Sequence, residues 1–233
     1  MPSFGKAYAG SEAYKDSELP QIDILIITHD HYDHLDKKTI SRLSAKTKVV
    51  YTPLGVGKYV KKWSGNTLQV NELDWWETAE IDENVTLTAL PARHFSGRGL
   101  KRWKTQWASY ALKAHGCHLY IGGDSGYDTF FKSIGETHGP FDMAMLNIGQ
   151  YNNFWPLIHM TPEEAVQASL DLNARALLPV HWGKFTLANH SWNEPIVRTE
   201  RHAALKNLMI TTPMIGEPVV IGEELPNKVW WNL

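Results

Sequence analysis

The stretch ILIITHDHYDHLD, from Ile24 to Asp36, constrains the fold of this chain more than any other. It begins with a short, continuous and β-branched apolar run, which is typical of a buried strand. Three histidines and several aspartates follow directly, in the pattern H-x-H-x-D-H. Such polar groups at the end of a buried strand are costly to desolvate unless something neutralises them. The stretch therefore predicts a sheet with a cation-binding rim.

The residue types in this pattern are those that hold metals. Imidazole and carboxylate groups are the ligands that zinc and similar divalent ions accept. His29 and His31 can aim at one point, while the adjacent Asp33 and His34 can be presented to a second point. The alternative is a polar loop whose histidines bond to the backbone, but it would not explain the polar residues at other strand ends. Those residues are His94, Asp124 and His181.

The rest of the chain alternates between strand and helix patterns without repeats or linkers. Strands are predicted at 22–28, 48–53, 85–92, 109–114, 118–123, 141–149 and 176–180. Helices are predicted from Asp36 to about Ala45 and over 55–65, 128–134, 161–174 and 193–208. An extended tail containing PVVI should follow. The pattern predicts a single α/β domain over residues 1–233, with mixed sheets and helices outside them. Strand ends meet at one rim of such a sheet.

Composition narrows the class of protein. Hydrophobic residues make up 43% of the 233 residues and charged residues 21%, which allows a full core. The net charge of −2 argues against an extended nucleic-acid surface. Cys117 is the one cysteine, which excludes an internal disulfide and a cysteine-based metal site. The N-terminus lacks an apolar signal core, and no apolar run is long enough to span a bilayer, so we expect a cytoplasmic protein.

Five segments together resemble the metallo-β-lactamase superfamily: ITHDHYDHLD, PARHFSGR, YIGGDSGY, HMTPEEAV and LPVHWGKF. Within it, they are most similar to the branch of N-acyl-phosphatidylethanolamine-hydrolysing phospholipase D and its bacterial relatives. The resemblance runs from about Ile22 to Phe185 and implies an αββα sandwich. It also implies two divalent metal ions, for which zinc fits the nitrogen-rich ligand set best, with manganese or iron as alternatives.

The resemblance assigns a role to each ligand residue. His29, His31 and His94 would hold one metal, and Asp33, His34 and His181 would hold the second. Asp124 would bridge the two ions. Among these, Asp33 is also expected to be catalytic, and His159 would orient substrate or pass a proton to the leaving group. For His159 the alternative is a histidine at a helix start without chemistry.

The implied activity is hydrolysis by a water that the two ions share and acidify to hydroxide. The expected substrate is a small-molecule or lipid-like phosphodiester. The same site could open a lactone or another carbonyl ester. A nuclease of the same superfamily is a further alternative, but the net charge of −2 argues against it. A metal-binding protein without catalysis is another, but the complete set of ligands argues against it.

The chain departs from the family pattern before the motif. Relatives carry a strand-rich segment there, whereas only 28 residues precede His29 and they show little strand pattern. We therefore expect a sandwich that lacks some N-terminal strands. An exposed sheet edge invites pairing with another chain, which suggests a homo-oligomer.

Several residues near the motif segments have two interpretations. Asp30 could receive the second ring N–H of a ligand histidine, and Asp36 is expected to cap a helix. Cationic residues interleaved with Trp103 and Trp107 could hold a substrate phosphate or form a solvated loop; they are Arg93, Arg98, Lys101, Arg102 and Lys104. Three aromatic residues could wall an apolar pocket or belong to the core: Phe154, Trp155 and Trp182.

Overall fold

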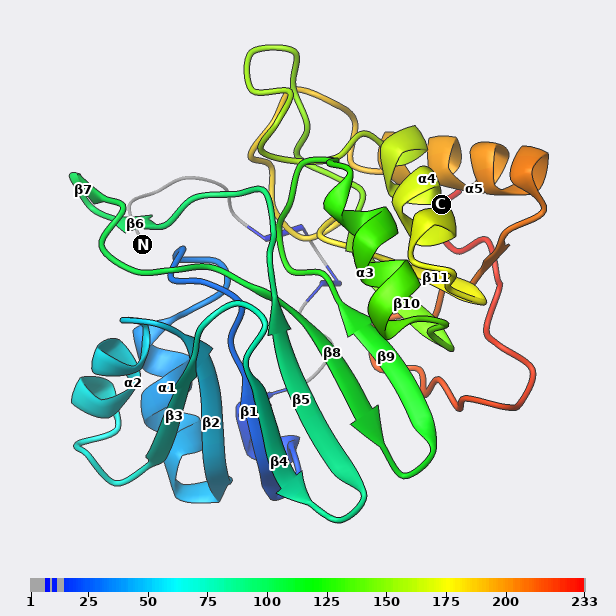
Figure 1. Ribbon diagram of the computed structural model, residues 1–233. Helices are drawn as coiled ribbons and strands as arrows, with labels where there is room; N and C mark the ends of the chain where they lie inside the picture. The colour runs from blue at the N-terminus through cyan, green and yellow to red at the C-terminus, as the bar shows by residue number, and fades with distance from the viewer. Residues whose placement is uncertain (1–6, 9, 12–14, 233) are drawn as a thin grey trace.

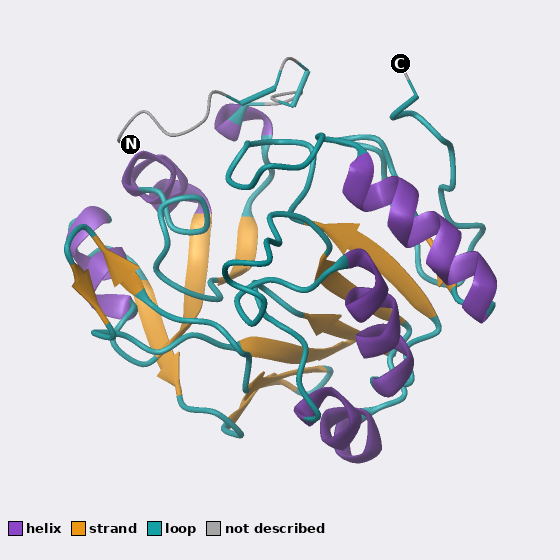
Figure 2. Cartoon of the chain, turned by 90° about the horizontal axis from the view of Figure 1, so that it is seen from above, coloured by secondary structure: helices purple, strands orange, loops and turns teal. Residues whose placement is uncertain are grey.

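The computed structural model, which describes residues 7–8, 10–11 and 15–232, has the predicted four layers (Figure 1). Two sheets pack face to face, and helices cover the outer side of each sheet (Figure 2). Three apolar clusters join neighbouring layers. One lies under each helical layer, and the third lies between the two sheets. This arrangement confirms the αββα sandwich.

The smaller sheet is parallel and has the strand order β1-β2-β3. Its strands are β1 (Ile22–Ile26), β2 (Thr47–Pro53) and β3 (Gln69–Leu73), and its helices are α1 (Lys37–Leu43) and α2 (Gly57–Trp63). Asp36 accepts a hydrogen bond from the Thr39 amide, which confirms it as the cap of α1. The helix then buries Ile40 against Val50 and Val60. A short 3-10 turn (Ser44–Lys46) continues α1 to the predicted end.

The larger sheet has the strand order β12-β11-β10-β9-β8-β5-β4. Its antiparallel half contains β4 (Thr78–Asp82), β5 (Val85–Leu90), β8 (Ser109–Ala114) and β9 (Cys117–Ile121). Its parallel half adds β10 (Met143–Asn147), β11 (Ala176–Val180) and β12 (Met209–Ile210). Three helices cover it: α3 (Phe130–His138), α4 (Pro162–Asp171) and α5 (Glu194–Lys206). A two-stranded hairpin, β6 (Gly97–Arg98) with β7 (Lys101–Arg102), stands apart from both sheets.

Contacts between the sheets fix the start of the histidine motif. Tyr51 of the smaller sheet packs in one cluster with Leu87 and Tyr110 of the larger sheet. The fully buried Tyr110 hydroxyl donates to the carbonyl of Ile27 at 3.0 Å, directly after β1. The Ala108 amide donates to the carbonyl of Thr28 at 2.9 Å. The backbone that leads into His29 is therefore held by β8 of the opposite sheet.

Some elements differ from the sequence expectation. Strands β3 and β4 were not predicted, because QVNEL and TAEID contain no continuous apolar run and each lies at a sheet edge. Helix α3 begins and ends later than expected, at Phe130 and His138 rather than at about 128 and 134. The PVVI segment at 218–221 has no assigned strand.

Strand β1 forms one edge of the smaller sheet among the described residues. Within the described part of the chain, β1 pairs only with β2. This leaves one side of β1 without a strand neighbour there, and pairing with a second copy remains a prediction. None of the helices among the described residues is both long and apolar enough to cross a membrane.

Candidate metal centre

All seven side chains that the sequence predicts as ligands meet at the same end of the sandwich. The histidine motif forms the loop between β1 and α1 and supplies His29, His31, Asp33 and His34. The other three come from loops after β5, β9 and β11; they are His94, Asp124 and His181. The two sheets therefore contribute together, as expected for strand ends at one rim.

The first group of donor atoms belongs to His29, His31, His94 and Asp124. Its members offer ligand atoms that all lie within 4.8 Å of one another. The Nε2 atoms of His29 and His94 are each 3.8 Å from Oδ2 of Asp124. His94 Nε2 is also 3.2 Å from His31 Nδ1. Three of the four residues are buried, and His31 is half-buried.

The second group belongs to Asp33, His34, His181 and the same Asp124. Asp124 Oδ2 lies 3.1 Å from His34 Nε2 and 3.3 Å from His181 Nε2. Asp33 Oδ2 lies 3.5 Å from His34 Nε2 and 3.4 Å from His181 Nε2. Asp124 thus belongs to both groups, which is the arrangement that a bridging carboxylate requires.

Unpartnered buried atoms show that this donor set fits a cation. Among the described residues, His29 Nε2 and Asp124 Oδ1 are buried without a hydrogen-bond partner. Buried polar atoms are normally satisfied, because leaving one unpaired costs roughly 1–3 kcal/mol. His29 Nε2 lies 3.8 Å from Asp124 Oδ2, within a set of imidazoles and carboxylates, the ligands that zinc accepts. The residues present therefore fit divalent metal binding.

A backbone carbonyl and a hydroxyl, rather than Asp30, lie against two of the ligand rings. His94 Nδ1 donates to the carbonyl of Ile158 at 3.0 Å, which leaves Nε2 free to face the site. His29 Nδ1 is 3.1 Å from the Thr28 hydroxyl. Asp30 instead accepts the Gly97 amide at 2.7 Å, so the proposed link from Asp30 to a ligand ring is wrong. A carbonyl partner such as Ile158 carries no signal in the sequence.

Charges inside the centre are strongly coupled. Burial opposes ionisation of Asp124, but His181 and His34 outweigh it and hold the pKa of Asp124 well below its usual range. Burial likewise opposes the charge on His34, yet Asp124 and Asp33 raise its pKa to about 9. Burial lowers the pKa of His94 to about 3. These shifts favour a protonated His34 and a neutral His94 around an ionised Asp124.

His159 lies against both ligand groups. Its ring stacks on His181, with centroids 5.2 Å apart, and meets His94 edge-on at 5.3 Å. Its Nδ1 is 3.9 Å from Asp124 Oδ2 and has no hydrogen-bond partner among the described residues. Burial lowers its pKa to about 4, so the ring is neutral at pH 7. A neutral ring at this place can donate or accept one hydrogen bond but holds no spare proton to release.

Arg98 ties the β6–β7 hairpin to the motif loop, a role that the sequence did not reveal. Its guanidinium donates to the carbonyls of Asp30 at 2.6 Å and Leu35 at 2.7 Å, on either side of the loop that holds His31, Asp33 and His34. It also lies 4.1 Å from the ring centroid of Tyr32. Arg98 therefore fixes the loop at both ends, rather than facing a substrate phosphate.

The expected aromatic pocket is not formed by these side chains. Trp182 stacks on Trp192 and Trp230, with centroids 6.3 and 5.1 Å apart, and so belongs to packing. Phe154 is 91% exposed, and the Trp155 ring N–H donates to the carbonyl of Gln150.

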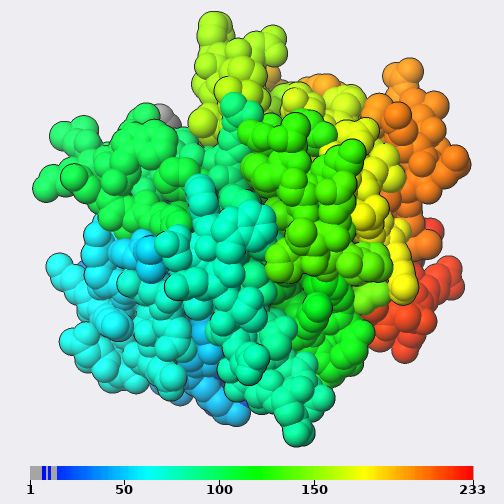
Figure 3. Space-filling model, viewed as in Figure 1, coloured from blue at the N-terminus to red at the C-terminus, as the bar shows by residue number. Residues whose placement is uncertain are grey.

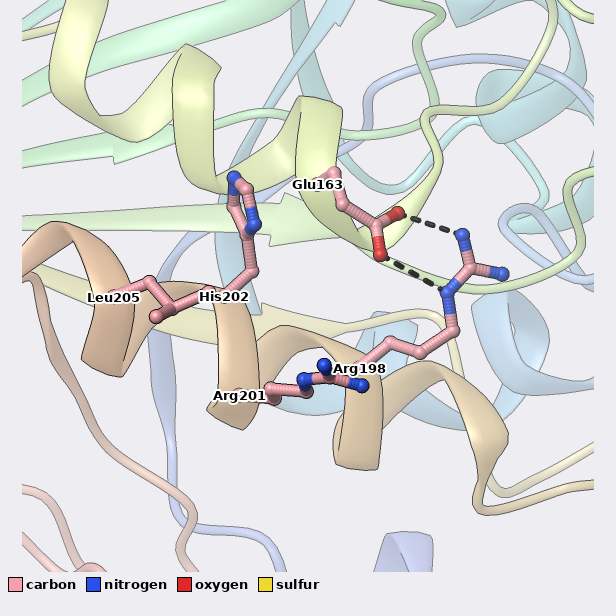
Figure 4. Close-up of a pocket in the computed structure, with 5 residues that line it drawn as sticks. All are labelled: Glu163, Arg198, Arg201, His202 and Leu205. Atoms are coloured by element: carbon pink, nitrogen blue, oxygen red, sulfur yellow. Dashed lines mark hydrogen bonds and ion pairs between the residues drawn. The ribbon is translucent and has the colours of Figure 1, made fainter.

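A groove of about 390 Å³ between α4 and α5 holds none of the predicted ligands (Figure 4). Its lining consists of Glu163, Arg198, Arg201, His202 and Leu205. Glu163 accepts two hydrogen bonds from Arg198, at 2.7 and 3.1 Å. This pair joins the two helices and accounts for the polar character of the groove.

Comparison with known proteins agrees with the geometry. Residues 2–182 match the family described as "Beta-lactamase superfamily domain". An archaeal UPF0173 metal-dependent hydrolase from Pyrococcus furiosus is 30% identical, over 72% of this chain and 70% of that protein. A solved metallo hydrolase from Ignicoccus hospitalis shares the fold, with a TM-score of 0.63 and 21% identity over 82% of this chain and 76% of its own.

Two longer relatives are also similar. An uncharacterized protein of Mycobacterium tuberculosis is 44% identical over 92% of this chain and 59% of its own length. The N-acyl-phosphatidylethanolamine-hydrolyzing phospholipase D 1 of Caenorhabditis elegans is 33% identical over 78% of this chain and 56% of its own length. The matched region thus spans little more than half of each of these two relatives.

Proposed function

Since this chain belongs to the beta-lactamase superfamily, we propose that it is a metal-dependent hydrolase that cleaves phosphodiester bonds in lipid-like substrates. One observation carries the proposal: two groups of donor atoms meet at one buried carboxylate, Asp124. A structural zinc site is usually closed by four ligands, whereas two groups that share an aspartate leave room for water and substrate. The choice of a phosphodiester is supported by the similarity to the phospholipase D of Caenorhabditis elegans.

The ligand roles follow from the distances. His29, His31 and His94 would hold one ion, Asp33, His34 and His181 the other, and Asp124 both. Bound divalent ions supply an acidified water and stabilise the negative charge that develops on the substrate. We propose zinc, two ions per chain, because five of the seven donors are imidazoles. We also propose that residues 1–233 act as a single metallo-hydrolase domain, because loops of both sheets supply the ligands.

The chain's own residues orient the reacting groups. Asp33 is ionised, because contacts with His181 and His34 outweigh its burial and lower its pKa to about 2. His94 presents Nε2 because its Nδ1 is engaged by Ile158. His159, beside both groups, would donate one hydrogen bond to a substrate oxygen. A proton for the leaving oxygen then comes from water, since the neutral His159 cannot release one.

The proposal is tested by metal depletion and by Asp124→Ala. Chelated protein is reloaded with zinc and assayed on bis(p-nitrophenyl) phosphate, on an N-acylphosphatidylethanolamine and on a lactone. We expect phosphodiester hydrolysis that needs added zinc, with elemental analysis giving two ions per chain. Asp124→Ala should lower the activity at least about 100-fold and remove one or both ions. Even the loss of an outer partner of a metal ligand lowers metal affinity or activity about 10–100-fold.

Asp128→Ala is the matched control, because Asp128 pairs with Arg93 outside the two donor groups. Its metal content and turnover should match those of the unchanged protein. Faster turnover of the lactone than of either phosphodiester would show that carbonyl esters are the substrates. Full activity of a folded Asp124→Ala protein would disprove the shared-carboxylate centre.

A further inference from the structure

The β6–β7 hairpin and the residues after it carry exposed apolar groups among cations. Leu100 is fully exposed and Trp103 is 64% exposed. Residues 94–107 contain four lysines and arginines and no acidic residue, in a chain whose net charge is −2. Three of these cations are exposed beside Leu100 and Trp103: Lys101, Arg102 and Lys104. We call Leu100, Lys101, Arg102, Trp103 and Lys104 the hairpin tip.

The hairpin that carries the tip contacts the candidate metal centre. The Arg98 guanidinium and the Gly97 amide bond to Asp30 of the motif loop. The Phe95 ring lies 4.6 Å from the His31 ring, and the Trp103 ring lies 6.0 Å from the Phe95 ring. A surface that meets the hairpin tip is therefore brought next to the ligands.

A second apolar projection stands at the same end of the sandwich. Phe154 and Leu157, in the loop between β10 and α4, are 91% and 48% exposed. The carbonyl of Ile158 in this loop holds His94, so this loop also borders the metal centre. In Figure 3 the loop before α4 stands out at the top of the molecule, and the β6–β7 hairpin stands out at its upper left. Single exposed apolar residues are common, but apolar tips among cations are typical of binding to a lipid surface.

We propose that the hairpin tip docks on an anionic lipid surface. Leu100 and Trp103 enter the boundary between headgroups and acyl chains, where an indole with a polar N–H is well placed. Lys101, Arg102 and Lys104 pair with lipid phosphates, and each such cation contributes about fivefold to binding at low salt. The inference rests on the proposed function, because docking would present a lipid-like phosphodiester to the metal centre.

Vesicle sedimentation tests the docking without any turnover. The unchanged, metal-free chain is mixed with phosphatidylcholine vesicles with and without phosphatidylglycerol. We expect stronger binding when phosphatidylglycerol is present and weaker binding as salt is raised. Lys101→Glu with Arg102→Glu should weaken binding about 25-fold or more, and Leu100→Ser with Trp103→Ser should also release the protein. The Lys101→Glu with Arg102→Glu variant should keep the zinc content and unfolding temperature of the unchanged chain.

Lys61→Glu with Lys62→Glu is the matched control, because both lysines are exposed on α2 outside the tip. Equal losses for the control and the tip variant would overturn the inference, as would binding of a DNA or RNA oligonucleotide at the tip without binding of anionic vesicles. Hydrolysis of the soluble bis(p-nitrophenyl) phosphate separates the two proposals. Turnover without vesicle binding overturns docking alone, whereas tip-dependent vesicle binding without turnover overturns the phosphodiesterase alone.

Discussion

A Cβ atom on Gly149 would lie 2.4 Å from the carbonyl oxygen of His181. His181 follows β11 with a φ of 63°, a left-handed conformation that is uncommon outside glycine. The Ile148 amide also donates to the carbonyl of Val180 at 3.0 Å. The backbone that presents the His181 ring is therefore held against the end of β10, and only a residue without a side chain fits there.

Gly149→Ala should displace His181 and weaken the second donor group. We expect zinc affinity to fall about 10–100-fold, the range found when the support of a metal ligand is lost. Competition with a chromogenic chelator measures this. Gly65→Ala is the control, because a Cβ atom there meets nothing within 4 Å; the left-handed φ of 67° should cost the alanine about 1 kcal/mol of stability and leave zinc affinity unchanged. Unchanged affinity of Gly149→Ala would contradict the close approach.

Arg98→Lys should loosen the motif loop without unfolding the sandwich. A lysine is a compact charge and cannot reproduce the guanidinium that bonds to the carbonyls of Asp30 and Leu35. Zinc affinity should fall at least about tenfold, again measured by chelator competition. Arg102→Lys, on the exposed side of the same hairpin, should behave as the unchanged protein. Equal affinities in the two variants would mean that Arg98 does not hold the loop.

His159→Gln should lower phosphodiester turnover without changing zinc content. Burial keeps His159 neutral, with a pKa of about 4, so the substitution removes only the hydrogen bond from this ring to the substrate. We expect the same fractional loss for aryl and alkyl leaving groups, about tenfold. Steady-state kinetics on a series of phosphodiesters measures it. A much larger loss for alkyl leaving groups would instead identify His159 as the acid that protonates the leaving oxygen.

Zinc binding should release a proton from His34. Burial opposes its charge, but Asp124 and Asp33 raise its pKa to about 9, so the metal-free ring is protonated at pH 7. A metal binds only the neutral ring of His34, and the fraction of neutral rings increases as pH rises towards 9. Apparent affinity should therefore rise about tenfold per pH unit from 7 to 9 through this group. Calorimetry in buffers of different ionisation enthalpy counts the protons, and His34→Asn should release about one fewer.

Most of the candidate centre could be predicted because its information is local. Each ligand directly follows an apolar run, so the sequence shows both the residue type and the strand end that carries it. The helix cap at Asp36 is equally local, since its side chain accepts a hydrogen bond from the amide three residues on. Strands β3 and β4 could not be predicted in the same way, because a polar strand at a sheet edge has no apolar run.

By itself the sequence predicted the seven candidate ligands and their order along the chain, and its resemblance to a known family implied the αββα class. Tertiary structure decided how those ligands are supported: the Ile158 carbonyl on His94, the Arg98 bridge over the motif loop, and Gly149 beneath His181. It also decided that Trp182 belongs to packing and that Leu100 and Trp103 stand exposed. The physical reason is that every residue has the same backbone carbonyl and amide. Which of them meets a distant side chain depends on how the sheets and loops pack, not on the local residue pattern.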